Sequence, residues 1–417
     1  MGKFDFLDKL LDGADVEWKT LGDIVEYSPT RVNAAGLDAS TFVGVDNLVI
    51  NKGGRVDANY APNTDRVTAY ELGDILIGNI RPYLKKIWKA TNSGGCSGDV
   101  LAVRILNHCK SIVCSDYLYY LLSSDDFFSY NMRHAKGAKM PRGNKAEILN
   151  YQIPVPCPDT PEKSLKIQAE IVRILDAFTA LTTELTTELT TELTSRKTQY
   201  NYYRDQLLSF DEGEVEWKTL PEMAVDFGRG KSKHRPRNDE RLYGGDVPFI
   251  QTGDIRNAAH VIMTHNQTYS DFGLQQSKLW PKGTLCITIA ANIAETSILG
   301  FDACFPDSVI GFVANPEKTT SAYVEYLLQS TKRKLEEKGR EKSSAQSNIN
   351  LGTFEELKLP FPPLAEQTRI VAILDKFDTL TNSITEGLPR EIQLRQKQYE
   401  YYCDLLLSFP KPEAVDA

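Results

Sequence analysis

The sequence lacks the features that mark membrane, secreted and metal-binding proteins. It contains no run of about 18 apolar residues, and its first fifteen residues mix charged with apolar side chains instead of forming a signal-peptide core. Its seven cysteines form no Cys-x-x-Cys pair, and its five histidines have no ligand spacing. We therefore expect a cytoplasmic protein with reduced thiols, no membrane partner and no metal or cofactor of its own.

Sequence motifs of catalysis are also missing. Gly230-Lys231-Ser232 resembles the end of a phosphate-binding loop, but Val225 occupies the position of the required first glycine. There is no glycine-rich dinucleotide motif, no HExxH, no GxSxG and no Asp/Asn-Pro-Pro-aromatic motif of an adenine methyltransferase. These joint absences predict a chain that is not an enzyme, with no catalytic, cofactor-binding or metal-binding residues. A fused restriction or methyl-transfer enzyme remains an alternative at this point.

The 417-residue chain contains a repeat. The segment Val16-Glu-Trp-Lys-Thr-Leu recurs from Val215, so that Trp18 and Trp217 are 199 residues apart. The same offset relates Gln168-Ala-Glu-Ile-Val-Arg-Ile-Leu-Asp to Gln367-Thr-Arg-Ile-Val-Ala-Ile-Leu-Asp. Between these blocks the two halves diverge. Because the residues before the first block resemble those before the second, the repeat is circularly permuted, which predicts that the two chain ends lie close together.

Apolar residues recur at helical spacing after each proline-rich segment, from Ile171 and again from Ile370. Each helix would be roughly 70 Å long at 1.5 Å per residue, too long to bury its apolar stripe against one domain. The two helices are therefore expected to pair as an antiparallel coiled coil, with a break near Gly387 and Pro389. The expected contact positions are Leu181, Leu185, Leu189, Leu193, Leu380, Ile384, Leu388 and Ile392.

The first of these helices contains three Thr-Thr-Glu-Leu units between residues 182 and 193. Low complexity allows an inert spacer, whereas a strict helical repeat would act as a ruler in which one unit moves the ends by roughly 6 Å. The globular parts mix short β-like runs with a few helices, such as Val100 to Ile105 and Ser321 to Glu337.

The predicted fold class is therefore α/β (α+β), with two globular domains separated by two long antiparallel coiled-coil helices in a circularly permuted pseudo-two-fold repeat. The divergence of the globular domains beside the conserved helices predicts that the two domains do different jobs while the helices do the same one, with simple gene duplication for stability as the alternative. The predicted segments are an N-terminal helical part at 1–14 that completes the second helical region, a first globular domain at 15–158, a first spacer helix at 159–212, a second globular domain at 213–362, a second spacer helix at 363–410 and a tail at 411–417.

Two runs of basic residues without any acid stand out in a chain of net charge −8. Lysine and arginine bind phosphate, and arginine, asparagine and glutamine read base edges, so both runs are candidate DNA contacts, although each could be a solvated loop. A third, mixed run at 332–342 has Gln346 and Asn348 beside it. The candidates are Arg133, Lys136, Lys139, Arg142, Lys145, Arg229, Lys231, Lys233, Arg235, Arg237, Gln346 and Asn348.

The repeated Glu-Trp-Lys-Thr-Leu starts, the Ile153-Pro-Val-Pro segment and the two Gln-x-x-Ile-Val-x-Ile-Leu-Asp helices resemble the specificity subunit of type I restriction-modification systems. The Thr-Thr-Glu-Leu units resemble the central repeats of one subfamily. The first copy departs from the family pattern at Cys157-Pro-Asp-Thr-Pro, where the linker geometry is in doubt.

The resemblance implies two target-recognition domains that read a bipartite, asymmetric site in double-stranded DNA. It also implies partners: two methyltransferase subunits that use S-adenosylmethionine to methylate adenine, and motor-nuclease subunits that use ATP and Mg. A tandem DNA-binding or scaffolding protein without a methyltransferase partner is the other alternative.

Overall fold

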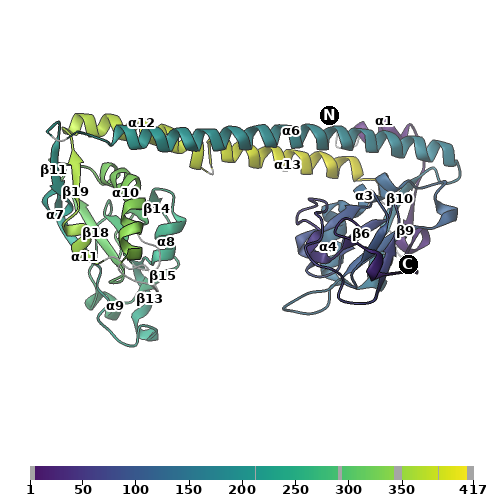
Figure 1. The fold of residues 1–417 in the computed structure, drawn as a ribbon, viewed down its shortest axis with the longest axis horizontal. Helices are drawn as coiled ribbons and strands as arrows, with labels where there is room; N and C mark the ends of the chain where they lie inside the picture. Colours follow the sequence, from purple (N-terminus) through teal and green to yellow (C-terminus); the bar gives the residue numbers. More distant parts are fainter. Residues whose placement is uncertain (1–4, 212, 290–293, 342–349, 384, 411–417) are drawn as a thin grey trace. The chain divides into compact units, whose positions relative to one another are not determined.

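The computed structural model describes residues 5–211, 213–289, 294–341, 350–383 and 385–410. These residues form two compact units, of which unit 1 comprises 1–185 with 395–417 and unit 2 comprises 186–394. Each unit combines one globular domain with parts of the long helices (Figure 1). None of the helices within the described ranges is long and apolar enough to cross a bilayer.

Unit 1 contains two four-stranded sheets, with strand orders β2-β9-β6-β7 and β3-β5-β8-β4, and the two-stranded sheet β1-β10. Strands β6 and β9 are almost entirely buried, which explains their continuous apolar sequences. The strands are β1 Val16–Thr20, β2 Val25–Tyr27, β3 Arg31–Asn33, β4 Phe42–Val43, β5 Arg66–Tyr70, β6 Ile75–Gly78, β7 Ile87–Lys89, β8 Gly94–Cys96, β9 Val100–Ile105 and β10 Gln152–Pro156. The α-helices before the long helix are α1 Asp5–Leu11, α2 Leu21–Ile24, α3 Ser115–Ser123, α4 Asp125–Arg133 and α5 Lys145–Leu149.

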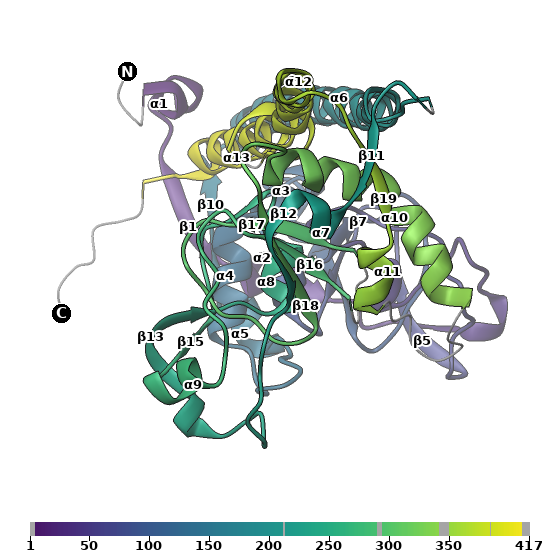
Figure 2. The same cartoon turned by 90° about the vertical axis from the view of Figure 1, so that its left-hand side faces the viewer.

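Unit 2 contains the five-stranded sheet β12-β18-β16-β17-β14 and the two-stranded sheets β11-β19 and β13-β15. Helix α10 packs on the five-stranded sheet through Tyr323 and Leu327, both buried (Figure 2). The strands are β11 Glu216–Thr219, β12 Ala224–Arg229, β13 Tyr243–Phe249, β14 Val261–Ile262, β15 Gln267–Tyr269, β16 Leu285–Thr288, β17 Thr296–Leu299, β18 Val309–Ala314 and β19 Lys358–Phe361. The helices of the globular part are α7 Leu220–Met223, α8 Thr252–Asn257, α9 Asp271–Gln275, α10 Ser321–Glu341 and α11 Leu351–Glu355.

The two repeated motifs pair with each other inside each unit. The Glu-Trp-Lys-Thr segment forms β1 or β11, and the proline-rich segment forms its antiparallel partner β10 or β19. Trp18 lies opposite Pro154, and Trp217 lies opposite Pro360. Within the described part of the chain each pair forms a sheet of two strands only, which is where prolines are tolerated because they donate no ladder hydrogen bond. The sequence contained both motifs, but only the structure shows that they pair.

The long helices follow these strands. Helix α6, Pro161–Leu207, is continuous over 47 residues, whereas the second copy is divided into α12, Leu364–Asn382, and α13, Gly387–Leu407. The predicted break at Gly387 is confirmed, and Gly387 has a φ of 74°, which glycine tolerates best. In the first copy the helix begins at Pro161, seven residues before Gln168, but in the second only three residues before Gln367. The Cys157-Pro-Asp-Thr-Pro departure therefore adds about one helical turn.

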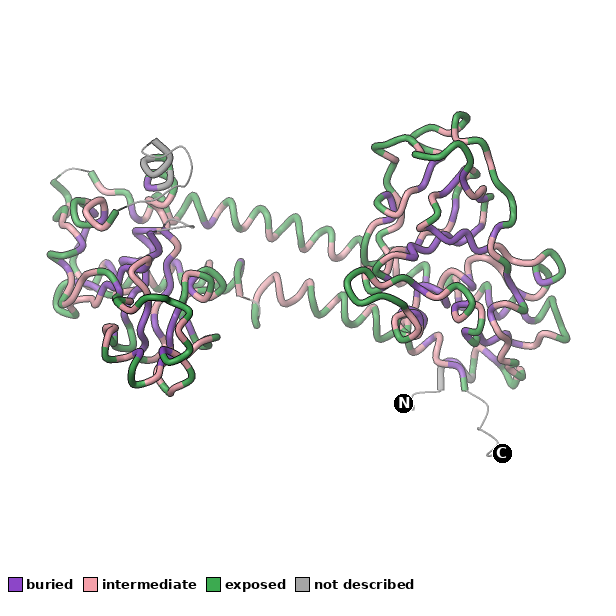
Figure 3. The backbone as a smooth tube through the Cα atoms, turned by 90° about the horizontal axis from the view of Figure 1, so that it is seen from below, coloured by how far each residue is buried: buried purple, intermediate pink, exposed green. Residues whose placement is uncertain are grey.

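Most of the leucines expected in a coiled-coil seam are partly buried, and two are exposed. Leu181 and Leu380, which are equivalent in the repeat, are 62% and 36% exposed, and their place in a coiled-coil seam stays a prediction. In the Thr-Thr-Glu-Leu units of α6, four residues per unit do not match 3.6 residues per turn, so the apolar stripe drifts around the helix. Ile384 lies outside the described residues. The partly buried positions are Leu185, Leu189, Leu193, Leu388 and Ile392, and Figure 3 shows α6 mainly in the colours of exposed and intermediate residues.

The chain ends meet inside unit 1, as the circular permutation predicts. Leu7 and Leu11 of α1 belong to the same buried cluster as Leu406 and Phe409. The indole Nε1 of Trp18 donates to the carbonyl oxygen of Pro410 over 2.9 Å. The repeated tryptophan therefore joins the start of the globular domain to the end of the last helix.

Candidate nucleic-acid interface

The first basic run forms an exposed loop between α4 and α5 in unit 1. Its five candidates, Arg133, Lys136, Lys139, Arg142 and Lys145, are all exposed. The loop is closed by a pair of backbone hydrogen bonds between Lys136 and Arg142, each 2.9 Å long. Arg142 also makes an exposed ion pair of 3.2 Å with Asp99, which contributes little to stability. The closed loop therefore presents Lys136 and Lys139 besides Arg142, while Arg133 ends α4 and Lys145 begins α5.

The base of this loop is packed too tightly for any residue but glycine. A Cβ at Gly143 would lie 2.6 Å from the Oδ1 atoms of both Asn79 and Asn131. Asn131, two residues before the basic run, is 1% exposed and lies on the inner face of α4. Its amide group is therefore not available at the surface. Asn144 caps α5 by accepting a hydrogen bond from Ala146 instead of facing solvent freely.

The second basic run follows β12 in unit 2. Arg229, Lys231, Lys233, Arg235 and Arg237 are all exposed. Two of them are engaged internally, because Arg235 donates to the carbonyl oxygens of Ser232 and His234, and Arg237 pairs with Asp307 at 2.8 Å. The ammonium groups of Lys231 and Lys233 have no partner among the residues that the structure describes. These two lysines are therefore exposed and uncommitted, and they stay candidates for phosphate contact.

Two residues inside the second run hold its shape. Gly230 is buried, and a Cβ there would lie 2.2 Å from the carbonyl oxygen of Phe305, so this glycine serves backbone packing and not phosphate binding. Asp239 accepts hydrogen bonds from Arg241, at 2.7 Å, and from His234, also at 2.7 Å. Hydrogen bonds from the Arg241 side chain and backbone hold the pKa of Asp239 well below its usual value. The loop therefore keeps its form at neutral pH.

In the third basic run, at 332–342, two cations are engaged in ion pairs. Lys332 pairs with Glu295 at 2.8 Å, and Arg333 pairs with Glu337 of its own helix at 3.2 Å. Gln346 and Asn348 lie outside the described residues. Asn350, which follows them, caps α11 by accepting a hydrogen bond from the backbone of Thr353. It occupies the same place before α11 that Asn144 occupies before α5.

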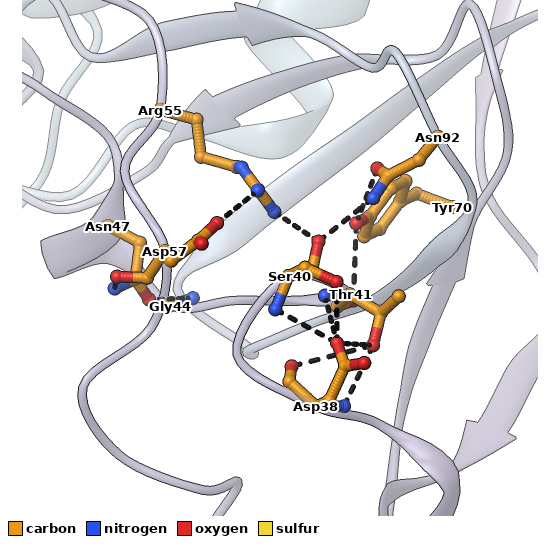
Figure 4. A network of polar contacts seen from close by, with 9 residues as sticks. All are labelled: Asp38, Ser40, Thr41, Gly44, Asn47, Arg55, Asp57, Tyr70 and Asn92. Atoms are coloured by element: carbon orange, nitrogen blue, oxygen red, sulfur yellow. Dashed lines mark hydrogen bonds and ion pairs between the residues drawn. The ribbon is translucent and has the colours of Figure 1, made fainter.

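A polar network fixes the loop around residues 38–47 of unit 1 (Figure 4). Asp38 accepts hydrogen bonds from the hydroxyl and backbone groups of Ser40 and Thr41, which lower its pKa. Arg55 donates to the carbonyl oxygen of Ser40 and to Asp57, and its guanidinium lies 5.0 Å from the centre of the Trp88 ring. Arg55 is thus committed to the fold and is a poor candidate for DNA contact.

The structure adds Arg81 to the first basic loop. Arg81 follows β6 and is exposed, and its backbone N–H donates to the carbonyl oxygen of Pro141 inside the loop over 2.7 Å. Beside it, Tyr83 is 49% exposed. Sequence reasoning missed both residues because they lie fifty or more positions before the basic run. The available signal was an Arg-Pro pair directly after a buried strand.

Equivalent hydrogen bonds attach each globular domain to the long helix of its own unit. In unit 1 the Tyr120 hydroxyl donates to Asp176 over 2.6 Å, and in unit 2 Tyr326 donates to Asp375 over 2.7 Å. Buried Gln168 and Gln367 bond backbone carbonyl groups of the domains in the same way. Hydrogen bonds to charged groups contribute about 1.5–3 kcal/mol, so these joints resist rotation of a domain on its helix.

Unit 2 adds a charge cluster in which Glu325 is buried and His260 and Asp378 are partly buried. His260 bonds Glu325 through Nδ1 at 2.9 Å and Asp378 through Nε2 at 3.1 Å. Burial alone lowers the pKa of His260, but hydrogen bonds and charge from the two carboxylates outweigh it and raise the pKa to about 10. Burial raises the pKa of Glu325, which is 1% exposed, to about 7. Within the described ranges, no group of three or more histidine, cysteine or acidic residues is arranged to hold a metal ion.

Comparison with known proteins identifies the family to which this chain belongs. The family model described as the type I restriction modification DNA specificity domain matches residues 59–195 and 214–394. The chain belongs to this family. The two matched segments cover most of both units, including the basic runs after β12 and between α4 and α5.

Relatives of this family match over the whole chain. The EcoR124I/EcoR124II type I restriction enzyme specificity subunit of Escherichia coli is 37% identical over 427 residues, which covers 100% of both chains. The EcoprrI type I restriction enzyme specificity subunit of Escherichia coli is 34% identical and covers 93% of each. A solved chain from a structural study of complex assembly and conformational transition in the type I R-M system shares the fold, with a TM-score of 0.70, 18% identity and coverage of 94% of this chain and 97% of that chain. Because the chain belongs to this family, the specificity-subunit interpretation is supported over the alternative of a tandem DNA-binding or scaffolding protein without a methyltransferase partner.

Proposed function

We propose that this specificity subunit reads a bipartite, asymmetric site in double-stranded DNA, with one half-site contacted by each unit. The observation that carries the proposal is that each unit presents an exposed basic loop without acids in a chain of net charge −8. The two loops occupy different places in the fold, one before α5 and one after β12. Two unlike half-sites require different contacts to base edges, and different placement of the loops allows them.

The long helices are proposed to be an antiparallel coiled coil that sets the distance and phase between the half-sites. Supporting this, Phe178 of α6 stacks on Tyr402 of α13 in unit 1, and Tyr203 of α6 stacks on Phe377 of α12 in unit 2. These pairs are equivalent in the 199-residue repeat. Catalysis is assigned to partner subunits, so that this chain chooses the site and the target adenine flips into the pocket of the methyltransferase.

The proposed partners are two methyltransferase subunits that use S-adenosylmethionine, with motor-nuclease subunits that use ATP and Mg in the full complex. A repeated exposed tyrosine supports two equal binding surfaces. Tyr202 is 59% exposed and Tyr401 is 57% exposed, each beside a tyrosine that is 39% exposed. Large exposed aromatic side chains are enriched among residues that dominate protein–protein interfaces.

Replacing Tyr202 or Tyr401 by Ala should remove one methyltransferase subunit each, and the double substitution should remove both. Loss of a buried aromatic anchor typically costs about 2 kcal/mol or more of binding free energy, equivalent to a weakening of about 30-fold. Native mass spectrometry or sedimentation of the reconstituted complex measures the stoichiometry. The matched control is Leu181→Ala, which removes another large apolar side chain that is 62% exposed on α6. Full assembly of the double variant would contradict the assignment.

Genome-wide mapping of methylated adenine in cells that contain this chain and its methyltransferase tests the function. The wild type should yield one bipartite site. Replacing Lys231 and Lys233 together by Ala should weaken the complex at one half-site and reduce the salt slope of binding by about 2, since each phosphate contact releases about one counterion. Equal weakening at both halves, or an unchanged slope, would reject this placement. The absence of any methylated site in the wild type would reject the proposed function itself.

A further inference from the structure

Arg81 has an unusual backbone conformation for its residue type. Its φ of 51° and ψ of 64° lie in the left-handed region, which glycine or asparagine adopts more readily. The next residue is Pro82, and a following proline further disfavours compact conformations and favours extended ones. Arginine is thus a costly choice at this position on conformational grounds alone.

The surrounding structure forces this conformation. The Arg81 N–H donates to the Pro141 carbonyl oxygen over 2.7 Å, and the Arg81 carbonyl oxygen accepts from Leu84 over 2.9 Å. On the other side, Asn51 donates to Leu84 over 2.9 Å and Lys52 donates to Lys85 over 2.8 Å. Asn51, Lys52 and Lys85 are themselves left-handed, so four of the strained residues gather in two contacting loops. Strained residues held in this way cluster at functional sites.

The side chain of Arg81 is left uncommitted by the fold. Its guanidinium is exposed and has no hydrogen-bond or ion-pair partner in the part of the chain that the structure describes. The neighbouring cations are engaged: Lys52 and Lys85 both pair with Asp125, at 2.7 and 2.8 Å, and Arg142 pairs with Asp99 at 3.2 Å. The structure thus fixes the backbone of Arg81 from both sides and leaves its planar donor group available.

A backbone fixed in this way suits base recognition more than phosphate attraction. Phosphates accept a cation from many directions, whereas the O6 and N7 atoms of guanine require two parallel donors in one plane. We infer that Arg81 reads a guanine in the half-site contacted by unit 1, and that Lys136 and Lys139 on the adjoining loop hold the DNA backbone. This inference rests on the proposed function and adds to it the residue and the base.

The test uses the chain assembled with its methyltransferase and the DNA site mapped for the wild type. Binding competition compares this duplex with duplexes in which each base pair of one half-site is replaced in turn. In Arg81→Lys the charge stays but the fork is lost, so preference at one guanine should fall about tenfold or more while every other position keeps its preference. The control Lys139→Ala should weaken all duplexes alike.

A second variant distinguishes a loss of base recognition from a loss of folding stability. Arg81→Asn places a residue that tolerates the left-handed region, so the melting temperature should stay equal or rise while the same guanine preference is lost. Retention of all preferences in both variants overturns the inference, as does a uniform loss across the duplexes or a loss in the half-site weakened by the Lys231 and Lys233 substitutions. If the wild-type complex itself prefers no duplex, the proposed function fails before Arg81 is tested.

Discussion

Deletion of one Thr-Thr-Glu-Leu unit, Thr186 to Leu189, is expected to abolish methylation at the original site and create a new site with the same half-sites and a shorter gap. Four residues contribute roughly 6 Å of rise and turn the helix about 40° beyond a full turn. Since one base pair corresponds to 3.4 Å along the DNA, the gap should shrink by one to two base pairs. Mapping of methylated adenine identifies both half-sites and the length of the gap between them in one experiment.

The structure explains why this deletion should leave the two globular domains intact. The boundary between the two compact units falls between Leu185 and Thr186, inside the repeated segment. Threonine hydroxyls in this segment bond the carbonyl four residues earlier in the same helix, as Thr190 does to Thr186 over 2.6 Å.

A length-preserving control accompanies the deletion. Replacing Thr186 and Thr187 together by Ala improves helix propensity without changing the number of residues, so the mapped gap should not change. A deletion variant that retains the wild-type gap would show that the helix is an inert spacer. Altered half-sites would show that the segment takes part in reading.

Replacing His260 by Ala is expected to destabilise unit 2 by about 3 kcal/mol at pH 8. Removal of one partner from a buried ion pair leaves an uncompensated charge, which typically costs about 3–5 kcal/mol. Here Glu325 is 1% exposed and Asp378 lies on the other side of the imidazole. Protonation of Glu325 in the variant relieves part of this loss of stability. The expected loss therefore lies at the lower end of the range of about 3–5 kcal/mol.

The pH dependence of the wild type follows from the same cluster. The folded pKa of His260, about 10, lies above its ordinary value of 6.5, so its stabilisation is full below pH 6.5 and is lost as the pH rises through 10. The folded pKa of Glu325, about 7, also lies above its ordinary value of 4.5, so its ionisation adds a penalty between pH 4.5 and 7. Both groups predict that unit 2 loses stability as the pH rises from about 5 to 10.

The buried thiols of the chain can report the unfolding of each unit separately. A brief pulse of thiol labelling along a urea titration, read by mass spectrometry, follows unit 2 through Cys286 and unit 1 through Cys96, both fully buried. His260→Ala should move the Cys286 transition and leave the Cys96 transition in place. Adding Glu325→Gln should restore part of the loss, because a neutral amide needs no counter-charge. Equal shifts of the two transitions would contradict a role confined to unit 2.

The repeat explains why much of the fold follows from the sequence. The 199-residue register, the helical apolar spacing and the Gly387-Pro389 break appear in the structure as α6, α12 and α13. The strand β9 and the helix α10 cover the segments predicted at Val100 to Ile105 and at Ser321 to Glu337. These features depend on local periodicity, which the sequence displays directly. The predicted domain boundaries remain predictions.

The candidate interface could be predicted only in part. Runs of basic residues are visible in any sequence, and all ten candidates of the first two runs are exposed. Their partners are not visible, because Asp307 lies seventy residues from Arg237 and Asp99 lies forty-three residues from Arg142. Whether a cation is free or paired therefore could not be inferred from its own segment.

By itself the sequence determined that this chain is a circularly permuted repeat with one exposed basic loop in each half. Only the tertiary structure decided that Trp18 closes the chain onto Pro410, that Asn131 is buried and that Arg81 stands beside a loop sixty residues away. The physical reason is the range of the forces concerned. Helix periodicity and charge runs act between near neighbours in the chain, whereas burial, ion pairing and backbone strain are set by residues that only the fold brings into contact.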